Sequence, residues 1–330
     1  MFRATTAISP NILGVIHMRH SLSMLGAVAV ATAGTAAAKP DETAQGDLEV
    51  RMGEAIAITI NDQPVRIRLA PDAISVPTLN ADAAQRIGLK PSMIGYIYVI
   101  GPEKIGFRTD NVRYRAETAA PFKRRTAFSD RQVANGVDGI AGPETFPFRR
   151  TKLTLRDPDP ADQPITLPLD TEMGRSQTGV RIDVGGRPIF AAFSFDRAES
   201  LVTATGGKWI ADANGGRFEG DAREAPILYG VSRPIRSLML DRPLMLGELE
   251  VRNLAVRVSD IGNSRGIAES DAPEPDPNEI VVSSDSKGKV PNQRLYLGMD
   301  TIGHCASITY DFTAKTVTLM CPRQPQLPNS

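Results

Sequence analysis

The sequence predicts an all-β protein with few short helices, organised as two similar lobes. Its 330 residues include 28 glycines and 25 prolines, which are spread between short apolar runs. Such frequent turn formers favour short strands over helical bundles. The length allows about two domains of roughly 100–200 residues each. An internal repeat supports the same division, because a hairpin pattern and a later glycine-containing strand each occur twice.

Composition narrows the classes of partner. Lys and Arg number 38, and so do Asp and Glu, so the net charge is close to zero. This balance gives neither a basic surface for nucleic acid nor a single-sign field for a strongly charged partner. The hydrophobic fraction of 41% is sufficient for a packed core, which excludes wholesale disorder. We therefore expect no nucleic-acid partner, and the oligomeric state stays open.

Residues 1–38 have the pattern of an export signal. A basic pair precedes the apolar run 22–31, and three alanines end the segment just before Lys39. A positive start, an apolar centre and a small-residue end are what signal peptidase requires. The apolar run is much shorter than the roughly 20 residues that span a bilayer. We expect a mature chain that begins near Lys39 in the periplasm or outside the cell, with residues 1–17 as an upstream extension.

The repeated hairpin occupies residues 58–69 and residues 182–193, which match without a gap. Each copy reads as strand, tight turn, proline and strand, and the prolines Pro64 and Pro188 are 124 positions apart. The turn dipeptides are Asn-Asp and Gly-Gly, which tolerate positive φ. The same local unit is therefore predicted in both halves.

The second repeated landmark is an apolar strand that ends in Gly142 in the first half and in Gly298 in the second. These glycines are 156 positions apart, so the second half is longer by about 32 residues. Most of the excess is residues 262–290, which are rich in Ser, Asp, Pro and Glu. Such a composition buries little apolar surface and predicts a mobile loop.

The predicted lobes are residues 39–172 and 178–322, followed by a tail at 323–330. Helical signal is weak outside Asn80 to Leu89, where an alanine-rich stretch suits a short helix. The pairs Gly185-Gly186 and Gly215-Gly216 are interpreted as hairpin turns rather than phosphate-binding loops.

Two cysteines, Cys305 and Cys321, flank a predicted hairpin. If the hairpin turns at residues 312–314, paired residues have numbers that add up to 626, and the two cysteines lie opposite each other. They are then within reach of a disulfide, which would persist in an oxidising compartment. Two buried thiols remain the alternative.

These landmarks together resemble the pepsin-like and retropepsin-like aspartic proteases. The closing pattern of that family matches Leu-Gly-Met-Asp-Thr-Ile at 297–302 and the hairpin at 308–319. The first half matches through residues 75–80 and 138–143. The resemblance covers nearly all of residues 50–322, and is greatest to bacterial secreted proteins of the group. It implies a two-lobed, acid-protease-like double β-barrel.

The resemblance also implies a flap, a hairpin that covers the substrate in this family. Its counterpart is residues 96–100, a turn at 101–104, and a return through 105–108. An ordinary surface hairpin is the alternative. The residues expected to contact a peptide are Tyr96, Tyr98 and Gly101.

Catalysis in this family needs two carboxylates, one per lobe, close enough to share one proton. The Asp-Thr-Gly motif that supplies them is missing from both halves. Counting from the prolines puts the motif at residues 70–72 and 194–196, where the catalytic positions hold Ala70 and Ser194. Asp72 and Asp196 stand at the third position of each triplet, 124 positions apart.

Asp72 and Asp196 are therefore candidates for a shifted catalytic dyad. The alternative role is structural, since aspartates in turns after strands accept hydrogen bonds from nearby backbone N–H groups. A different alignment puts Asp196 at the family aspartate, with Arg197 and Ala198 in place of Thr-Gly. Arg197 would then hold a carboxylate ionised, which opposes a shared proton.

The sequence lacks the residues needed for a zinc site or a phosphate-binding loop. After cleavage near residue 39 the remaining histidine is His304, which we place in the strand leading to Cys305. A zinc site built on His and Cys then has too few ligands. No Gly-Lys-Ser/Thr phosphate loop is present. We expect neither a metal nor a cofactor.

The sequence thus predicts an exported pseudoenzyme of the aspartic protease type that binds a peptide or protein segment in the cleft between its lobes. One alternative is an active aspartic endopeptidase that uses Asp72 and Asp196. Another is a structural envelope protein whose cleft is closed and unused. Whether the protein hydrolyses peptides stays open at this point.

Overall fold

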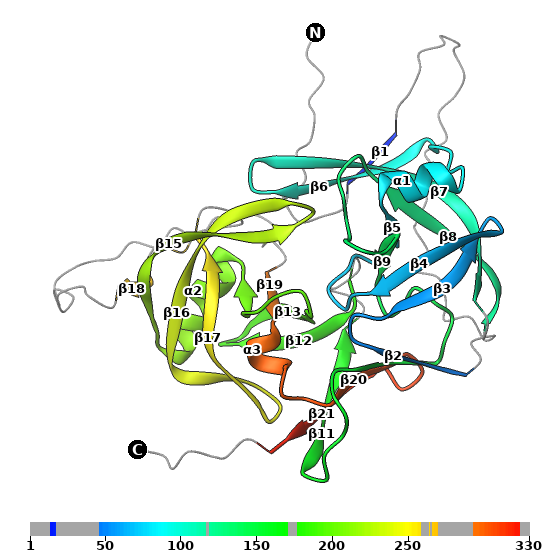
Figure 1. Cartoon of the computed structure of the whole chain (residues 1–330). Coiled ribbons are helices and arrows are strands. Elements are labelled where there is room, and N and C mark those ends of the chain that lie inside the picture. The colour runs from blue at the N-terminus through cyan, green and yellow to red at the C-terminus, as the bar shows by residue number, and fades with distance from the viewer. Residues whose placement is uncertain are drawn as a thin grey trace, which may run out of the picture.

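The computed structural model in Figure 1 confirms the all-β prediction, since strands make up most of the described chain. It describes residues 14–17, 46–116, 119–170, 177–258, 264, 266–269 and 293–323. Apart from residues 14–17, the predicted export signal lies outside the described residues, as does most of the predicted loop 262–290. No described helix has the length and apolar character needed to cross a membrane.

The first half forms a closed barrel. Its strands are β2 (Asp47–Arg51), β3 (Ala55–Ile60), β4 (Gln63–Leu69), β5 (Thr78–Leu79), β6 (Ile94–Ile100), β7 (Glu103–Ala116), β8 (Ala119–Phe128) and β9 (Gly139–Ala141). Six of them follow the order β7-β3-β4-β9-β5-β8, and pairing of β8 with β7 closes the ring. The short helix α1 (Ala81–Arg86) lies within the predicted range 80–89.

The second half repeats the central strands of the first. Its strands are β12 (Gly179–Val184), β13 (Arg187–Phe193), β14 (Leu201–Val202), β15 (Arg217–Leu228), β16 (Val231–Leu246), β17 (Leu249–Arg257), β18 (Ala268–Glu269) and β19 (Arg294–Leu297). The order β13-β19-β14-β17 has the same directions as β4-β9-β5-β8: parallel, antiparallel and parallel. These four strands therefore have the same topology in both halves.

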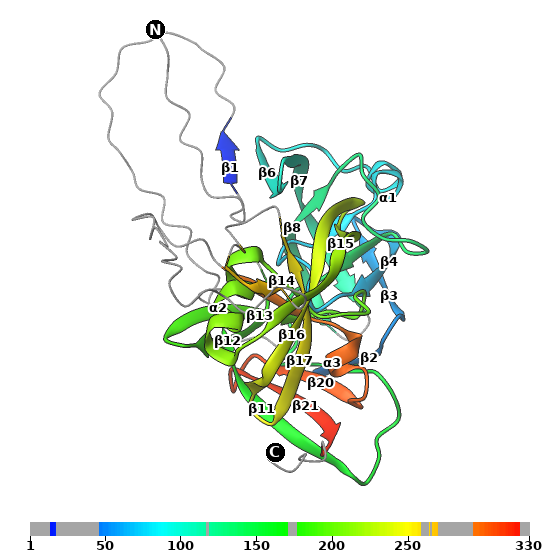
Figure 2. The ribbon, with the colours of Figure 1, turned by 90° about the vertical axis from the view of Figure 1, so that its left-hand side faces the viewer.

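The second half does not close into a barrel among the described residues, so the all-β prediction holds with one closed barrel and one large open sheet in place of two barrels. Helix α2 (Ala204–Asn214) contacts both β16 and β12. Strands β12 and β16 correspond to β3 and β7, which pair directly with each other in the first half. Figure 2 shows α2 beside β12 and β13.

A shared sheet joins the two halves. It contains β10 (Arg150–Thr154), β11 (Asp162–Asp170), β20 (Ser307–Asp311) and β21 (Thr316–Pro322). The strand order β12-β11-β21-β20-β10-β2 takes strands from both ends of the chain. This sheet fixes the relative position of the halves, because its interstrand hydrogen bonds connect one half to the other.

The repeated hairpins have the predicted turns. Asn61 and Asp62 have φ of 50° and 65°, and Gly185 and Gly186 have φ of 59° and 79°. Both hairpins therefore connect their strands through two residues of positive φ, the geometry that matches the strand twist. The register is equivalent, with Ile60 opposite Gln63 and Val184 opposite Arg187.

Helix α2 was not predicted, and the reason is its pair of glycines, Gly206 and Gly207. Glycine lowers helix propensity by about 1 kcal/mol per residue. A Cβ at Gly207 would lie 2.6 Å from the side chain of Val256, so close packing requires glycine here. Gly215 ends this helix with φ of 72°, so its interpretation as a hairpin turn was wrong. Helix α3 (Met299–Ile302) was also not predicted.

The cysteine hairpin forms, but its predicted register was wrong by one residue. Asp311 pairs with Thr316, so the turn contains four residues instead of three. The Asp311 carboxylate accepts hydrogen bonds from the backbone N–H of Thr313 and Ala314, and Lys315 has φ of 55°. The predicted disulfide between Cys305 and Cys321 is present.

Candidate functional site

The site lies between the halves, where the chain leaves β4 and β13. The backbone N–H of Ala70 donates to the carbonyl of Ala141 at 2.9 Å, and that of Ser194 donates to the carbonyl of Leu297 at 2.8 Å. Gly142 and Gly298 directly follow these two carbonyl residues, as the repeat predicted. Ala70 and Ser194 therefore occupy equivalent positions, and neither carries a carboxylate.

Asp72 is buried at this junction, with 8% of its surface exposed. The hydroxyl of Ser194 in the other half donates a hydrogen bond to Asp72 Oδ2 at 2.6 Å. Arg197 Nε lies 4.0 Å from the same oxygen, and Gln177 donates to the backbone carbonyl of Asp72. Burial raises the pKa of the Asp72 carboxyl, although Arg197 and the Ser194 hydrogen bond each act to lower it.

Asp196 has different partners. Its two carboxylate oxygens accept hydrogen bonds from Nη1 and Nη2 of Arg68, both at 2.8 Å. The Asp196 side chain is 52% exposed, unlike that of Asp72. No hydrogen bond among the described residues joins the two carboxylates. This arrangement does not favour a shared proton, and the use of the pair as a dyad stays a prediction.

Arg197 has a central place in the junction. Its guanidinium lies over the ring of Tyr296, 4.9 Å from the centroid, and donates to the backbone carbonyls of Pro226 and Ile227. Arg197 was expected to keep a carboxylate ionised. It acts on Asp72, whose pKa it lowers, but burial raises that pKa by more.

The flap counterpart is the hairpin of β6 and β7. Ile100 pairs with Glu103, so the turn is Gly101-Pro102 and the predicted four-residue turn at 101–104 was wrong. Gly101 has φ of 60°, a conformation that glycine adopts without strain. A Cβ at this position would lie 2.7 Å from the Arg233 side chain, which comes from β16. The tip of the flap thus touches the second half.

Aromatic packing holds the flap against the second half. The ring centroid of Tyr229, which follows β15, lies 6.0 Å from Tyr98 and 5.0 Å from Phe107. Tyr229 belongs to a buried cluster that contains residues of both halves. Burial raises the pKa of both Tyr98 and Tyr229. A small cavity remains at the junction, lined by Asp72, Tyr98, Ile100, Gln177, Arg197, Ile227, Leu228, Arg257 and Tyr296.

The free edge of the flap pairs with another segment of the chain. Strand β1 (Gly14–His17) lies antiparallel to β6, with Gly14 opposite Ile97 and His17 opposite Ile94 (Figure 1). Residues 14–17 belong to the predicted export signal, and no sequence pattern indicated this pairing. Pairing between distant segments leaves no local pattern in the sequence.

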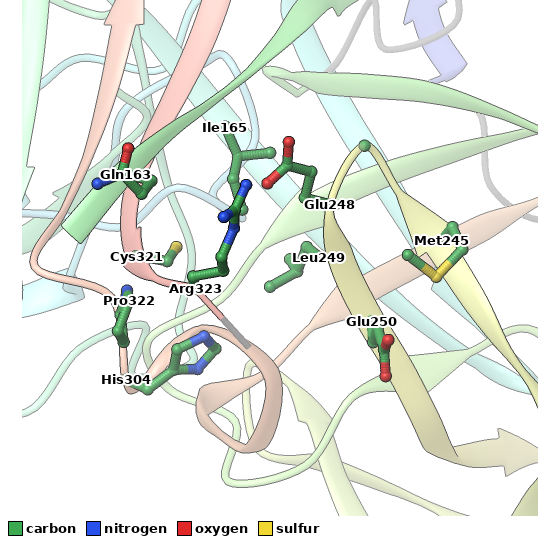
Figure 3. Close-up of a pocket in the computed structure, with 11 residues that line it drawn as sticks. Gln163, Ile165, Met245, Glu248, Leu249, Glu250, His304, Cys321, Pro322 and Arg323 are labelled. Atoms are coloured by element: carbon green, nitrogen blue, oxygen red, sulfur yellow. The ribbon is translucent and has the colours of Figure 1, made fainter. Parts of the chain in front are cut away.

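A second cavity, of about 300 Å³, lies on the shared sheet near the disulfide (Figure 3). Its walls come from β11, β21, the turn between β16 and β17, and the turn after α3. His304 is in that last turn, not in a strand as predicted. Burial and the nearby Arg156 lower the pKa of His304. The lining residues are Gln163, Ile165, Met245, Gly247, Glu248, Leu249, Glu250, His304, Cys321, Pro322 and Arg323.

Comparisons with known proteins give distant similarity to solved structures. No family model matches the sequence, and no curated protein matches it. Among solved structures, the chain is similar to EIAV protease complexed with the inhibitor HBY-793, with 19% identity and a TM-score of 0.21. The match covers 27% of this chain and 79% of that one. A TM-score this low carries no weight for function.

Proposed function

We propose that this protein binds an extended peptide or protein segment by strand addition to the flap, without hydrolysing it. The observation that carries the proposal is the antiparallel pairing of β1 with the outer edge of β6. An edge strand presents unpaired N–H and C=O groups, and an added strand satisfies them through main-chain hydrogen bonds. This binding mode needs no catalytic group.

The residues at the junction support a protein that does not hydrolyse its ligand. Ala70 cannot activate a water molecule, and the hydroxyl of Ser194 is committed to Asp72. The Asp196 carboxylate is bound by both terminal nitrogens of Arg68. A shared-proton dyad needs two carboxylates in contact with each other and with water. Each acidic group here is already paired with another partner.

The closed-cleft alternative also has an observation in its favour. The buried cluster under the flap joins Phe107 of the first half to Tyr229 and Ile235 of the second. Packed apolar side chains leave little room for a ligand between the halves. In this alternative the protein is a structural or envelope interaction protein, and it binds its partner by strand addition at β6 rather than in a cleft.

We further propose that the protein is exported to the periplasm or beyond. The pattern of residues 1–38 and the disulfide between Cys305 and Cys321 support this location. Cell fractionation tests it: the chain, shortened to about residue 39 by mass spectrometry, should be found outside the cytoplasm. A full-length chain in the cytoplasm with free thiols would contradict it.

The test of strand addition uses a peptide with the sequence of residues 11–20 and a chain that begins at Lys39, in which the edge of β6 has lost β1. The peptide should slow hydrogen exchange of the β6 amides, and the full-length chain should bind it more weakly because β1 competes. Peptides methylated on alternate backbone nitrogens provide the control. Methylation of one alternate set should abolish binding and the other set should be tolerated, since alternate N–H groups face the partner strand. Equal binding of all peptides would contradict the proposal.

A further inference from the structure

Three potential metal ligands meet at the wall of the second cavity. The Nε2 atom of His304 lies 3.9 Å from Cys305 Sγ. This nitrogen and the sulfurs of Cys305 and Cys321 all lie within 4.8 Å of one another. They come from the turn after α3 and from β21, two segments that the hairpin brings together. In the oxidised chain the two sulfurs are bonded to each other, so neither is a thiolate.

The position of His304 beside Cys305 suits a zinc-type ion once the disulfide is reduced and the two sulfurs have moved apart to about 3.8 Å, the separation of two thiolates on such an ion. Zinc binds thiolate sulfur at about 2.3 Å and imidazole nitrogen at about 2.0–2.1 Å in tetrahedral sites. Adjacent nitrogen and sulfur ligands around such an ion are therefore about 3.5 Å apart. The 3.9 Å between His304 Nε2 and Cys305 Sγ is close to this separation. Two thiolates and one imidazole are the protein ligands of a known class of open zinc site.

The cavity supplies access for the ion and space for a fourth ligand. His304 and Cys321 both line it, so an ion bound by them would face the opening. Figure 3 shows these two residues on one side and Glu248, Leu249 and Glu250 on the ribbon across from them. An open site keeps its fourth position for water or a small ligand. The sequence predicted too few protein ligands for a zinc site. Three are present, and the missing fourth ligand belongs at the position that faces solvent.

We propose that reduction of the disulfide between Cys305 and Cys321 creates a binding site for a zinc-type divalent cation, with His304 as the third ligand. The reductant is a dithiol, which transfers two electrons and two protons to the cystine and becomes a cyclic disulfide. Binding of the ion then releases the two thiol protons to solvent. The cation site exists when the disulfide is reduced and is absent when it is oxidised.

The experiment uses the full chain and Co²⁺ alone as the probe. The protein is reduced with a dithiol, freed of it without air, and titrated beside the oxidised protein. The reduced chain should bind one Co²⁺ and give thiolate-to-cobalt charge-transfer absorption, and the oxidised chain should give none. His304→Gln should weaken binding by more than the roughly 10–100-fold lost with an outer-shell partner, because a direct ligand is removed. Gln163→Ala, which changes a lining residue with no ligand role, should bind like the native chain.

Near-ultraviolet circular dichroism of the Co²⁺-bound chain shows whether the fold is kept. Folded reduced protein with the expected spectrum and a loss in His304→Gln supports the proposal. Absence of charge-transfer absorption in the reduced chain would overturn it. Equal binding by the native chain and His304→Gln would also overturn it, since unfolded thiols bind the ion without the histidine.

Discussion

The hydroxyl of Ser194 donates a hydrogen bond to the Asp72 carboxylate at 2.6 Å, across the junction between the two halves. Ser194 stands where the aspartic protease resemblance places a catalytic carboxylate, and Asp72 stands at the glycine position of the other half. The hydrogen bond links the two loops of the junction to each other. Ser194 and Asp72 therefore connect the two halves.

Asp72→Asn should change how stability depends on pH. Burial raises the Asp72 pKa in the folded chain, so between the unfolded carboxyl pKa near 4 and this raised value the folded state binds more protons. The free energy of unfolding therefore falls as pH rises through that window. The amide side chain of the variant does not titrate, so the variant lacks this fall. Relative to the native chain it should gain about 1.4 kcal/mol per unit of pKa shift between acid and neutral pH. Urea unfolding across this range measures the difference, and a difference that is constant with pH would contradict the account.

Asp196→Asn should have a small effect that depends on salt. The ion pair of Asp196 with Arg68 is bidentate, but the Asp196 side chain is 52% exposed. Exposed pairs contribute about 0.2–1 kcal/mol, and salt screens them. We expect a loss of at most about 1 kcal/mol in the free energy of unfolding at low salt. At high salt the loss should shrink. A loss several times larger would mean that Asp196 has a role the structure does not account for.

Gly298→Ala should destabilise the junction. A Cβ at this position would lie 2.6 Å from the backbone carbonyl of Glu199, and backbone atoms cannot move aside cheaply. Overpacking of this kind costs about 1–3 kcal/mol. Gly106→Ala is the matched control, because a Cβ at Gly106 meets no atom within 4 Å. Thermal unfolding of both variants separates the two cases, and equal midpoints would be inconsistent with the described packing.

Tyr229→Ala should release the flap. The Tyr229 side chain packs against Tyr98 and Phe107, and only 5% of the residue is exposed. Truncation of a buried aromatic ring costs roughly 3–5 kcal/mol. Hydrogen exchange of residues 94–108 should become faster. Tyr229→Phe keeps the ring and should leave flap exchange close to native. Unchanged exchange in Tyr229→Ala would show that other contacts hold the flap closed.

Local sequence signals predicted local structure well. Asn61-Asp62 and Gly185-Gly186 adopt the positive φ that their residue types favour, so both hairpins formed as predicted. The disulfide was predicted as well. The register of the hairpin between its cysteines was not, because it depends on the positive φ of Lys315 in the turn. Nothing in the residue type of Lys315 indicates that conformation.

Features that depend on tertiary contacts could not be predicted. Close packing of Gly207 against Val256 stabilises α2 in spite of its low helix propensity. Asp72 and Ser194 are 122 positions apart, and Arg68 and Asp196 are 128 apart. The sequence showed that the catalytic motif is missing, but the partners of the remaining aspartates depend on how the halves meet.

The most direct test of the central claim is incubation of the purified protein with unfolded casein from acid to neutral pH, with Asp72→Asn and Asp196→Asn as parallel samples. Since each carboxylate is paired with another group, we expect intact casein in all three samples at every pH. Casein fragments that form with the native chain and disappear in both variants would establish a working dyad of Asp72 and Asp196 and contradict a non-hydrolytic protein.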